Sequence, residues 1–373
     1  MINILNTNKN IWSYIIFHNI LTRENILVYF LCINIYMSSF VKTNIVSSIQ
    51  DNGNNTTKIL RNPWDVVILN DTIWTAVNGS WTLQQYTIEG VFLKSVFVTA
   101  ISDFNRPTGL VAYNGNSFLY LNGSGVMTPS KLITVTETGT INAYDPASTV
   151  NVAPITFSDP TKVFTGCDIY NDQLYVANFA SGFVEVYNGT FSHTSQFTDT
   201  AMTSIGYAPY NVKFINGNLY VTYAKQTPTK RDNVPGIGFG YVDIFSPDGT
   251  YIKRFANRDT LNVPWAILPY RVMINGNLID VVLIGNFGDG KINMFTTNGT
   301  FVGFLHDSNG IEFMIDGLWG FVEWQGSGNR TAIYFVAGIN DENDGVIGNL
   351  TIGNMVFGNM NIGHLTIRSL NIT

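Results

Sequence analysis

GCDIY at 166–170, QLYVAN at 173–178 and GFVEVY at 182–187 form the stretch of sequence that decides the fold. Short apolar strands end at Asn or begin at Gly, and the same order returns in NLIDVVLIGN at 277–286 and GDGKINMF at 288–295. A period of roughly 40–60 residues built from short strands is typical of propeller blades. The pattern therefore predicts a repeated all-β fold.

The composition of the 373-residue chain agrees with that fold class. Charged residues make up 12% and aromatic residues 13%, which suits half-buried strands, and 34 glycines supply turns. Asn-Gly pairs predict hairpin turns, because Asn and Gly accept the positive φ angles of type I′ turns; examples begin at Asn78, Asn114, Asn188, Asn216, Asn275 and Asn298. A net charge of -6 offers no basic field, so no nucleic-acid partner is expected.

We expect one six-bladed β-propeller of four-stranded antiparallel blades over residues 37–352. The blades are predicted to open near Asn62-Pro63-Trp64, Arg106-Pro107, Gly166-Cys167-Asp168, Ala208-Pro209, Val263-Pro264-Trp265 and Asp316-Gly317-Leu318-Trp319. The strand at Phe40–Val46 should complete the last blade, because closing the ring removes two exposed sheet edges. The Pro/Gly-rich stretch 225–240 is expected to be a loop.

Residues 1–36 differ from the repeat and are expected to lie outside the propeller core. The apolar run 26–41 is shorter than the roughly 20 residues of a spanning helix, and we interpret it as helical. Three interpretations stay open: an uncleaved membrane anchor or signal, a start codon set too early with Met37 as the true first residue, or a buried appendage.

The C-terminal tail, residues 353–373, continues a second repeat of consecutive five-residue units that starts at Gly348, such as GNMNI at 358–362 and GHLTI at 363–367. This tail resembles pentapeptide repeats, but so few units bury little core of their own. We expect a docked extension or an oligomer contact.

Two further features have simple structural explanations. Cys167 is expected to be a small buried residue in a strand, and with Cys32 as the second cysteine no disulfide framework is implied. Asn-x-Ser/Thr sequons are frequent, which indicates either a glycoprotein or chance in an Asn-rich chain; examples are Asn70, Asn78, Asn122, Asn188, Asn298, Asn329 and Asn349.

The strand and entry motifs resemble known propellers. LYVAN at 174–178, GYAPYN at 206–211, GYVDIF at 240–245 and GNFGDG at 285–290 look like NHL and gluconolactonase-like six-bladed propellers, and are most similar to an uncharacterised family of secreted bacterial propellers. The chain departs from that family after Trp64 and Trp265, where the family usually has Gly. The resemblance implies a fold, without an established activity.

Polar residues at strand ends could form a metal site. Asp65, Asp168, Asn178, Asn211, Asn286, Asp289 and Asp316 occupy places that a propeller directs toward its channel. We select Asn178, Asn286 and Asp316 as ligands of a hard cation such as Ca²⁺, which prefers oxygen ligands. The alternative is that these side chains cap turns. The acidic loop 340–345 is expected to be a solvated turn, and Trp64, Trp265 and Trp319 to fill space between blades.

Two functions therefore compete. The leading one is a non-enzymatic binding or structural propeller with a protein or glycan ligand, extracytoplasmic or on a virus particle, with residues 26–41 as a membrane anchor. The alternative is a calcium-dependent, lactonase-like hydrolase acting at the central channel. A channel filled by Trp and aliphatic side chains would argue against the second.

Overall fold

A computed structural model describes residues 13–22, 25–34, 38–101, 105–326 and 331–353; for the first two segments only the backbone is described. Within these residues the chain is almost entirely β-structure, with one short α-helix, α1 (Thr200–Thr203), and one 3₁₀ turn, η1 (Asn78–Ser80). The prediction of an all-β fold is confirmed.

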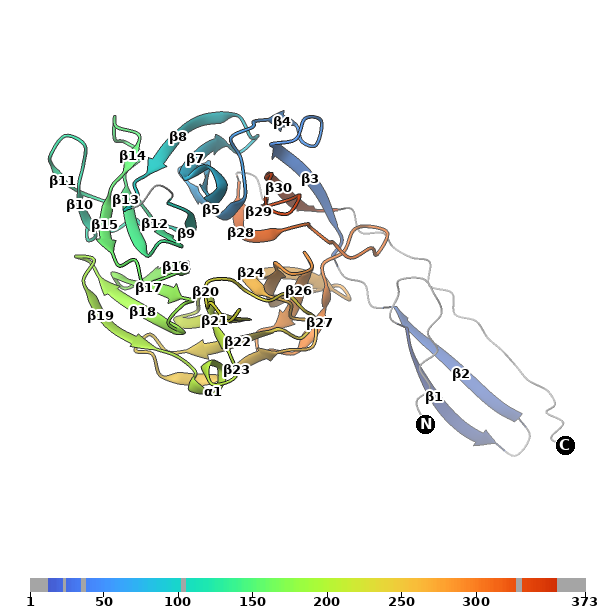
Figure 1. The fold of residues 1–373 in the computed structure, drawn as a ribbon. Helices are drawn as coiled ribbons and strands as arrows, with labels where there is room; N and C mark the ends of the chain where they lie inside the picture. The colour runs from blue at the N-terminus through green and yellow to red at the C-terminus, as the bar shows by residue number, and fades with distance from the viewer. Residues whose placement is uncertain (1–12, 23–24, 35–37, 102–104, 327–330, 354–373) are drawn as a thin grey trace.

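Six sheets of the described chain form a ring (Figure 1). Blade 1 contains β5 (Pro63–Leu69), β6 (Thr72–Val77), β7 (Thr82–Thr87) and β8 (Phe92–Val98), with β14 (Val152–Ala153) added in parallel to β8. Blade 2 contains β9 (Pro107–Ala112), β12 (Leu132–Thr136), β13 (Thr140–Tyr144) and β15 (Ile155–Ser158), and carries the small hairpin β10 (Leu119–Leu121) and β11 (Met127–Pro129).

Blades 3 to 5 are four consecutive strands each. Blade 3 contains β16 (Phe164–Tyr170), β17 (Gln173–Asn178), β18 (Phe183–Asn188) and β19 (His193–Phe197). Blade 4 contains β20 (Tyr207–Ile215), β21 (Asn218–Lys225), β22 (Gly240–Phe245) and β23 (Tyr251–Asn257). Blade 5 contains β24 (Pro264–Ile274), β25 (Asn277–Asn286), β26 (Ile292–Thr296) and β27 (Phe301–Phe304). The predicted blade openings coincide with the first strands.

Blade 6 is built from both ends of the propeller chain. Its sheet runs β28 (Leu318–Gln325), β29 (Thr331–Ala337), β30 (Val346–Ile352), β3 (Phe40–Ser47) and β4 (Asn55–Thr56). Strand β3 pairs antiparallel with β30, from Phe40 opposite Ile352 to Ser47 opposite Val346. The predicted closure of the ring by the strand after Met37 is therefore confirmed, and it leaves neither β3 nor β30 as an unpaired edge.

Tight turns at the first hairpin of most blades follow directly from sequence. Asn216-Gly217 and Asn275-Gly276 both have positive φ at both positions, as a type I′ turn requires. Asn70-Asp71 and Asn171-Asp172 do the same with Asp in second place. Asn78-Gly79 also joins an antiparallel hairpin, between β6 and β7, but through the 3₁₀ turn η1 in place of a type I′ turn, and Asn78 is buried.

Side chains of the innermost strands tie neighbouring blades together. The Asp65 carboxylate of β5 accepts the backbone N–H of Leu110 in β9 at 2.8 Å, and Asp168 of β16 accepts that of Phe214 in β20 at 2.8 Å. Asn211 of β20 donates to the carbonyl of Trp265 in β24 at 3.0 Å. These residues therefore satisfy backbone groups between blades, and the ring is held by polar bridges as well as apolar packing.

The N-terminal segment corrects one prediction. The apolar run is not helical: β2 (Asn25–Asn34) pairs along its length with β1 (Ser13–Thr22), and the two form a separate two-stranded sheet, drawn apart from the ring in Figure 1. The abundance of Ile, Val, Tyr and Phe in this segment favours a strand once a partner of equal length is available. In the described part of the chain no helix has the length and apolar character needed to span a membrane. The predicted C-terminal repeat, beyond residue 353, lies outside the described residues.

Candidate functional site: an axial pocket over an aromatic floor

Aromatic side chains from four blades meet at the centre of the ring. Trp64 of β5 stacks on Trp319 of β28 with ring centroids 3.7 Å apart, and Phe287 stacks on Trp319 at 4.0 Å. Trp265 of β24 and Tyr210 of β20 contact the same ring, with centroids 6.0 and 6.2 Å from it. Tyr210 and the three Trp side chains are buried. Because blades 4 and 6 are not neighbours, their contact through Trp319 places this aromatic floor on the ring axis.

A pocket of about 460 Å³ lies over this floor. Its lining residues come from five of the six blades, which is possible only where the blades converge. The floor is contributed by Trp64, Tyr210 and Trp319, and polar side chains form the walls, among them Asn62, Asn78, Glu137, Thr165, Asn233 and Glu342. This volume lies within the usual range for small-molecule sites.

Two glutamates face this pocket, and a buried amide holds each of them. Glu137 follows β12, and its Oε2 accepts a hydrogen bond of 3.1 Å from Nδ2 of Asn78. Glu342, in the loop between β29 and β30, accepts one of 3.1 Å at Oε2 from Nδ2 of Asn62. Asn62 is oriented in turn by the indole N–H of Trp319, which donates to its Oδ1 at 3.0 Å. Trp319 of the aromatic floor thus orients the Asn62 amide, and Asn62 in turn holds the Glu342 carboxylate.

Burial dominates the electrostatics of the two acids. It raises the pKa of Glu342 to about 7, and the negative charge of Glu137 adds to that shift, while the hydrogen bond from Asn62 opposes it. The pKa of Glu137 is also raised by burial, against the hydrogen bond from Asn78 and the charge of Arg106. Beside them, burial holds the pKa of Tyr210 well above its ordinary value, and Asn233 donates to its hydroxyl at 2.8 Å.

A loop from blade 4 crosses the mouth of the pocket. Between β21 and β22, the guanidinium of Arg231 donates to the backbone carbonyl of Glu137 in blade 2 at 3.3 Å. Two more arginines stand at the rim: Arg106, 3.8 Å from the Glu137 carboxylate with its side chain 59% exposed, and Arg61, which donates to the carbonyl of Asn343 at 3.3 Å. The pocket therefore has acids and amides inside and guanidinium groups at its entrance.

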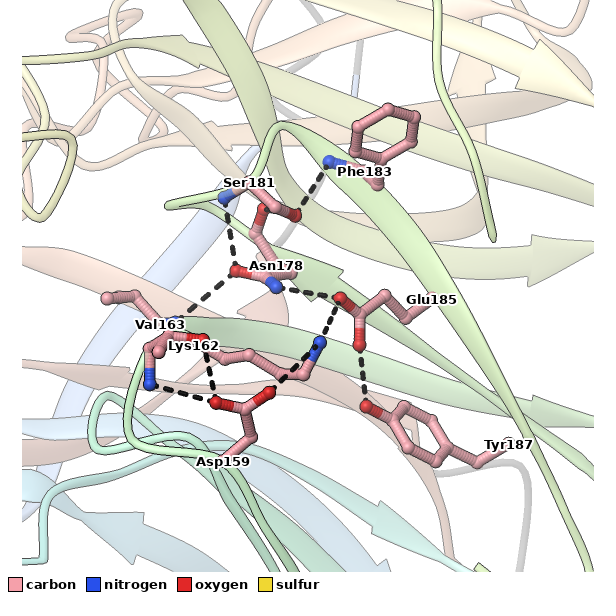
Figure 2. Close-up of polar contacts among 9 residues, drawn as sticks. Asp159, Lys162, Val163, Asn178, Ser181, Phe183, Glu185 and Tyr187 are labelled. Atoms are coloured by element: carbon pink, nitrogen blue, oxygen red, sulfur yellow. Dashed lines mark hydrogen bonds and ion pairs between the residues drawn. The ribbon is translucent and has the colours of Figure 1, made fainter. Parts of the chain in front are cut away.

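The three side chains predicted to bind calcium occupy other positions. Asn178 ends β17 and is part of a buried network (Figure 2): its Nδ2 donates to Oε1 of Glu185 at 2.8 Å, and its Oδ1 accepts the backbone N–H groups of Val163 and Ser181 at 3.3 Å. Lys162 pairs with the same Glu185 oxygen at 2.8 Å. Asn178 thus fixes the turn between two strands.

Asn286 and Asp316 also have partners within their surroundings. Nδ2 of Asn286 donates to the carbonyl of Thr260 at 2.8 Å and to Asp289 at 3.0 Å. Asp316 accepts the backbone N–H of Asn340 at 2.9 Å. Among the residues that the structure describes, no hydrogen bond joins any two of the predicted ligands, and none of the three lines the axial pocket. A calcium site at Asn178, Asn286 and Asp316 stays a prediction.

No group of three or more His, Cys, Asp or Glu side chains in the described segments has an arrangement suited to a metal ion. The predicted set contains one carboxylate and two amides, so this observation does not decide its case.

Sequence reasoning did not find the residues of the pocket. Asn78 directly follows β6, at the strand end where Asn178 and Asn286 lie in other blades, and only Asn78 of these reaches the pocket. Glu342 lies in the acidic loop interpreted as a solvated turn. Trp64, Trp265 and Trp319, which were expected to fill space between blades, instead contact one another at the ring axis, whereas Cys167 is buried as predicted.

Comparison with known proteins adds a family to this architecture. No protein-family model matches the chain. The fold and the site define a six-bladed β-propeller with an axial pocket. An uncharacterized protein of Acanthamoeba polyphaga mimivirus is 33% identical, over 82% of this chain and 78% of that protein, and a second one is 29% identical over 78% and 80%. The chain belongs to this family of mimivirus proteins. The expected bacterial family is thereby corrected to a viral one.

Solved structures give weaker similarities. A streptogramin B lyase structure superposes with a TM-score of 0.49 at 13% identity, covering 86% of this chain and 98% of that one. A putative 6-phosphogluconolactonase from Bacteroides uniformis gives a TM-score of 0.40 at 12% identity, covering 67% and 70%. Neither similarity carries information about activity.

Proposed function

We propose that this protein is a non-enzymatic binding propeller whose ligand occupies the axial pocket. The observation that carries the proposal is the combination of a 460 Å³ pocket with a closed aromatic floor. Asn62 and Asn78 each hold a wall glutamate in place through a hydrogen bond, and Asn233 does the same for Tyr210 of the floor. Groups fixed in this way lose little freedom when a ligand binds, which favours recognition.

The aromatic floor weighs against the lactonase-like alternative. That hypothesis requires a substrate and a calcium ion at the channel axis, and the stack of Trp64, Trp319 and Phe287 fills the axis below the pocket. A binding role needs only the volume above the floor. Calcium-dependent hydrolysis of a lactone by the purified protein, lost in Asp316→Ala, would overturn our preference.

A ligand screen tests the binding role. The purified chain is screened by thermal shift against neutral sugars, amino acids, amines and dicarboxylates, beside the variant Asp232→Trp. Asp232 lines the pocket and its side chain is exposed, so an indole there obstructs the entrance without disturbing the core. Glu89→Trp, an exposed position outside the pocket lining, is the matched control. We expect hits with wild type and Glu89→Trp that disappear in Asp232→Trp; an identical hit list for all three proteins contradicts the proposal.

We further propose that the protein is displayed on a virus particle or an extracytoplasmic surface, with the part of the apolar run 26–41 that forms β2 (Asn25–Asn34) contributing to attachment. The viral relatives and the separate β1–β2 hairpin support this placement. Asn298 is an exposed sequon Asn on a hairpin turn, whereas Asn78 is buried and its Nδ2 is engaged by Glu137. Detergent fractionation of purified particles, followed by glycosidase treatment, should find the protein in the outer fraction, modified at exposed sequons and unmodified at Asn78. Recovery only from infected-cell cytosol argues against display.

A further inference from the structure

The two pocket glutamates each use one carboxylate oxygen for the protein. Oε2 of Glu137 accepts from Asn78, and Oε2 of Glu342 accepts from Asn62. Within the described residues, no hydrogen bond to Oε1 of either glutamate is found. Two partly buried acceptors are therefore available in one pocket, and an ammonium group, with three N–H donors, matches them.

The entrance has the opposite character. Arg61, Arg106 and Arg231 line the outer part of the same pocket and all three are exposed. Their remaining N–H donors suit a carboxylate or phosphate. The acids Asp232 and Asp341 also lie at this rim, so the entrance is mixed and selects by hydrogen-bond geometry as well as charge.

One residue of the pocket floor, Trp64, is buried with its indole donor unpaired among the described residues. Trp64 contributes to the lining and is only 5% exposed, and its indole N–H has no acceptor in the described chain. Leaving a buried donor unpaired costs about 1–3 kcal/mol.

We propose that the axial pocket binds a small zwitterionic ligand, with its ammonium group against Glu137 and Glu342 and its anionic group toward the arginines of the rim. This inference rests on the proposed binding function and specifies its ligand class. The volume of 460 Å³ accommodates a molecule the size of an amino acid or an amino sugar phosphate.

Binding of an ammonium group depends on the ionisation of Glu342. Because its pKa is about 7 in the empty pocket, the affinity is expected to rise between pH 5.5 and pH 8, by roughly tenfold, while an alkylammonium ion stays charged. The groups that face Glu342 are Glu137 and Arg106 from blade 2, Asp232 from the blade 4 loop, and Tyr210. The pKa of Glu137 is raised as well, so its ionisation changes in the same direction.

Linear ω-amino acids are suitable probes, because their flexible chains adapt to the unknown spacing of the two charges. Binding of γ-aminobutyrate and ε-aminocaproate is measured by calorimetry or ligand-detected NMR at constant ionic strength. Hexylamine lacks the anion, caproate lacks the ammonium group, and N-acetyl-ε-aminocaproate has its amine capped. We expect at least one zwitterion to bind tenfold or more tightly than its capped and anionic analogues.

Two variants test the assigned contacts. Glu342→Gln keeps an acceptor for Asn62 and removes the charge, so we expect at least a tenfold loss of zwitterion affinity and a shallower pH profile, with only Glu137 left to titrate. Glu323→Gln is the matched control: Glu323 also accepts an amide hydrogen bond of 3.1 Å, from Gln325 in the same blade, but it does not line the pocket. The Glu323→Gln variant should bind the zwitterion with the same affinity as wild type.

Equal binding of ε-aminocaproate and its N-acetyl form, or unchanged affinity in Glu342→Gln, overturns the inference. If other compounds of the ligand screen still bind and Asp232→Trp blocks them, the binding function stands and only the ligand class is wrong. If no compound distinguishes Asp232→Trp from wild type, both fail.

Discussion

Replacing Trp319 tests two contributions to the site: the packing of the aromatic floor and the hydrogen bond that orients Asn62. Its ring lies between Trp64 and Phe287 with centroids 3.7 and 4.0 Å away, and it is fully buried. Trp319→Ala removes this ring from a well-packed centre, where Trp to Ala substitutions cost about 3–5 kcal/mol. It also leaves Oδ1 of Asn62 without its donor. We therefore expect a loss near the upper end, about 4–5 kcal/mol.

Trp319→Phe separates the two contributions. The ring stack is largely kept and the indole N–H is lost, so the expected cost is about 1–3 kcal/mol, the usual range for a buried acceptor left unpaired. Trp324→Phe is the matched control, because Trp324 lies in the same strand and its indole N–H makes only a 3.5 Å contact with Asp71 at the surface. Its loss should stay within about 0.5 kcal/mol.

Urea unfolding followed by far-UV circular dichroism measures these differences, since tryptophan fluorescence would itself change with the substitutions. The expected order of stability is wild type and Trp324→Phe, then Trp319→Phe, then Trp319→Ala. A Trp319→Ala protein within about 1 kcal/mol of wild type, or equal losses for the two Phe variants, would refute the proposed role of the aromatic floor.

Three other predictions address the ring itself. A chain that starts at Met37 should melt within about 2 °C of the full chain, because β3 and its bonds to β30 are retained, whereas removal of residues 1–47 should abolish folding. Gly166→Ala should cost about 2–3 kcal/mol, since the added Cβ would lie 2.0 Å from Oδ1 of Asn211. Cys167 is buried and burial raises the pKa of its thiol, so Ellman's reagent should label it only after unfolding.

Each of these has a clear contrary result. A folded, soluble chain without β3 would show that closure is dispensable. Gly276→Ala is the control for Gly166→Ala. No atom lies within 4 Å of the Cβ added at Gly276, so this variant should lose only about 1 kcal/mol of stability, from the positive φ of 77° at that position. Equal losses at both glycines would contradict the steric argument. Rapid labelling of Cys167 in native buffer would show that blade 3 opens.

Much of the architecture could be predicted because local chemistry repeats in every blade. Asn-Gly turns at Asn216 and Asn275 need positive φ, and Pro63 and Pro264 begin innermost strands where no ladder donor is needed. The strand after Met37 was identifiable because a ring of repeats lacks one strand at its end.

The pocket could not be predicted because its residues depart from the repeat. Glu137, Arg231 and Glu342 come from loops of three different blades and meet only when the ring closes. Asn178 and Asn286 share a place in the repeat, and that regularity reflects turn formation inside each blade. The prediction of a helix at 26–41 was wrong for another reason. Periodicity alone does not distinguish a buried helix from a strand, and pairing with β1 makes this segment the strand β2.

The pairing of β3 with β30 also has a consequence during synthesis. Strand β3 is the first propeller strand to leave the ribosome, and its partner β30 is among the last propeller residues to emerge. At roughly 5–20 residues per second, β3 waits on the order of tens of seconds with Phe40, Ile45 and Val46 uncovered. For that interval the nascent chain offers an open strand edge to other nascent chains on the same polysome. Blade 6 is therefore the part of this propeller whose completion most needs chaperone protection.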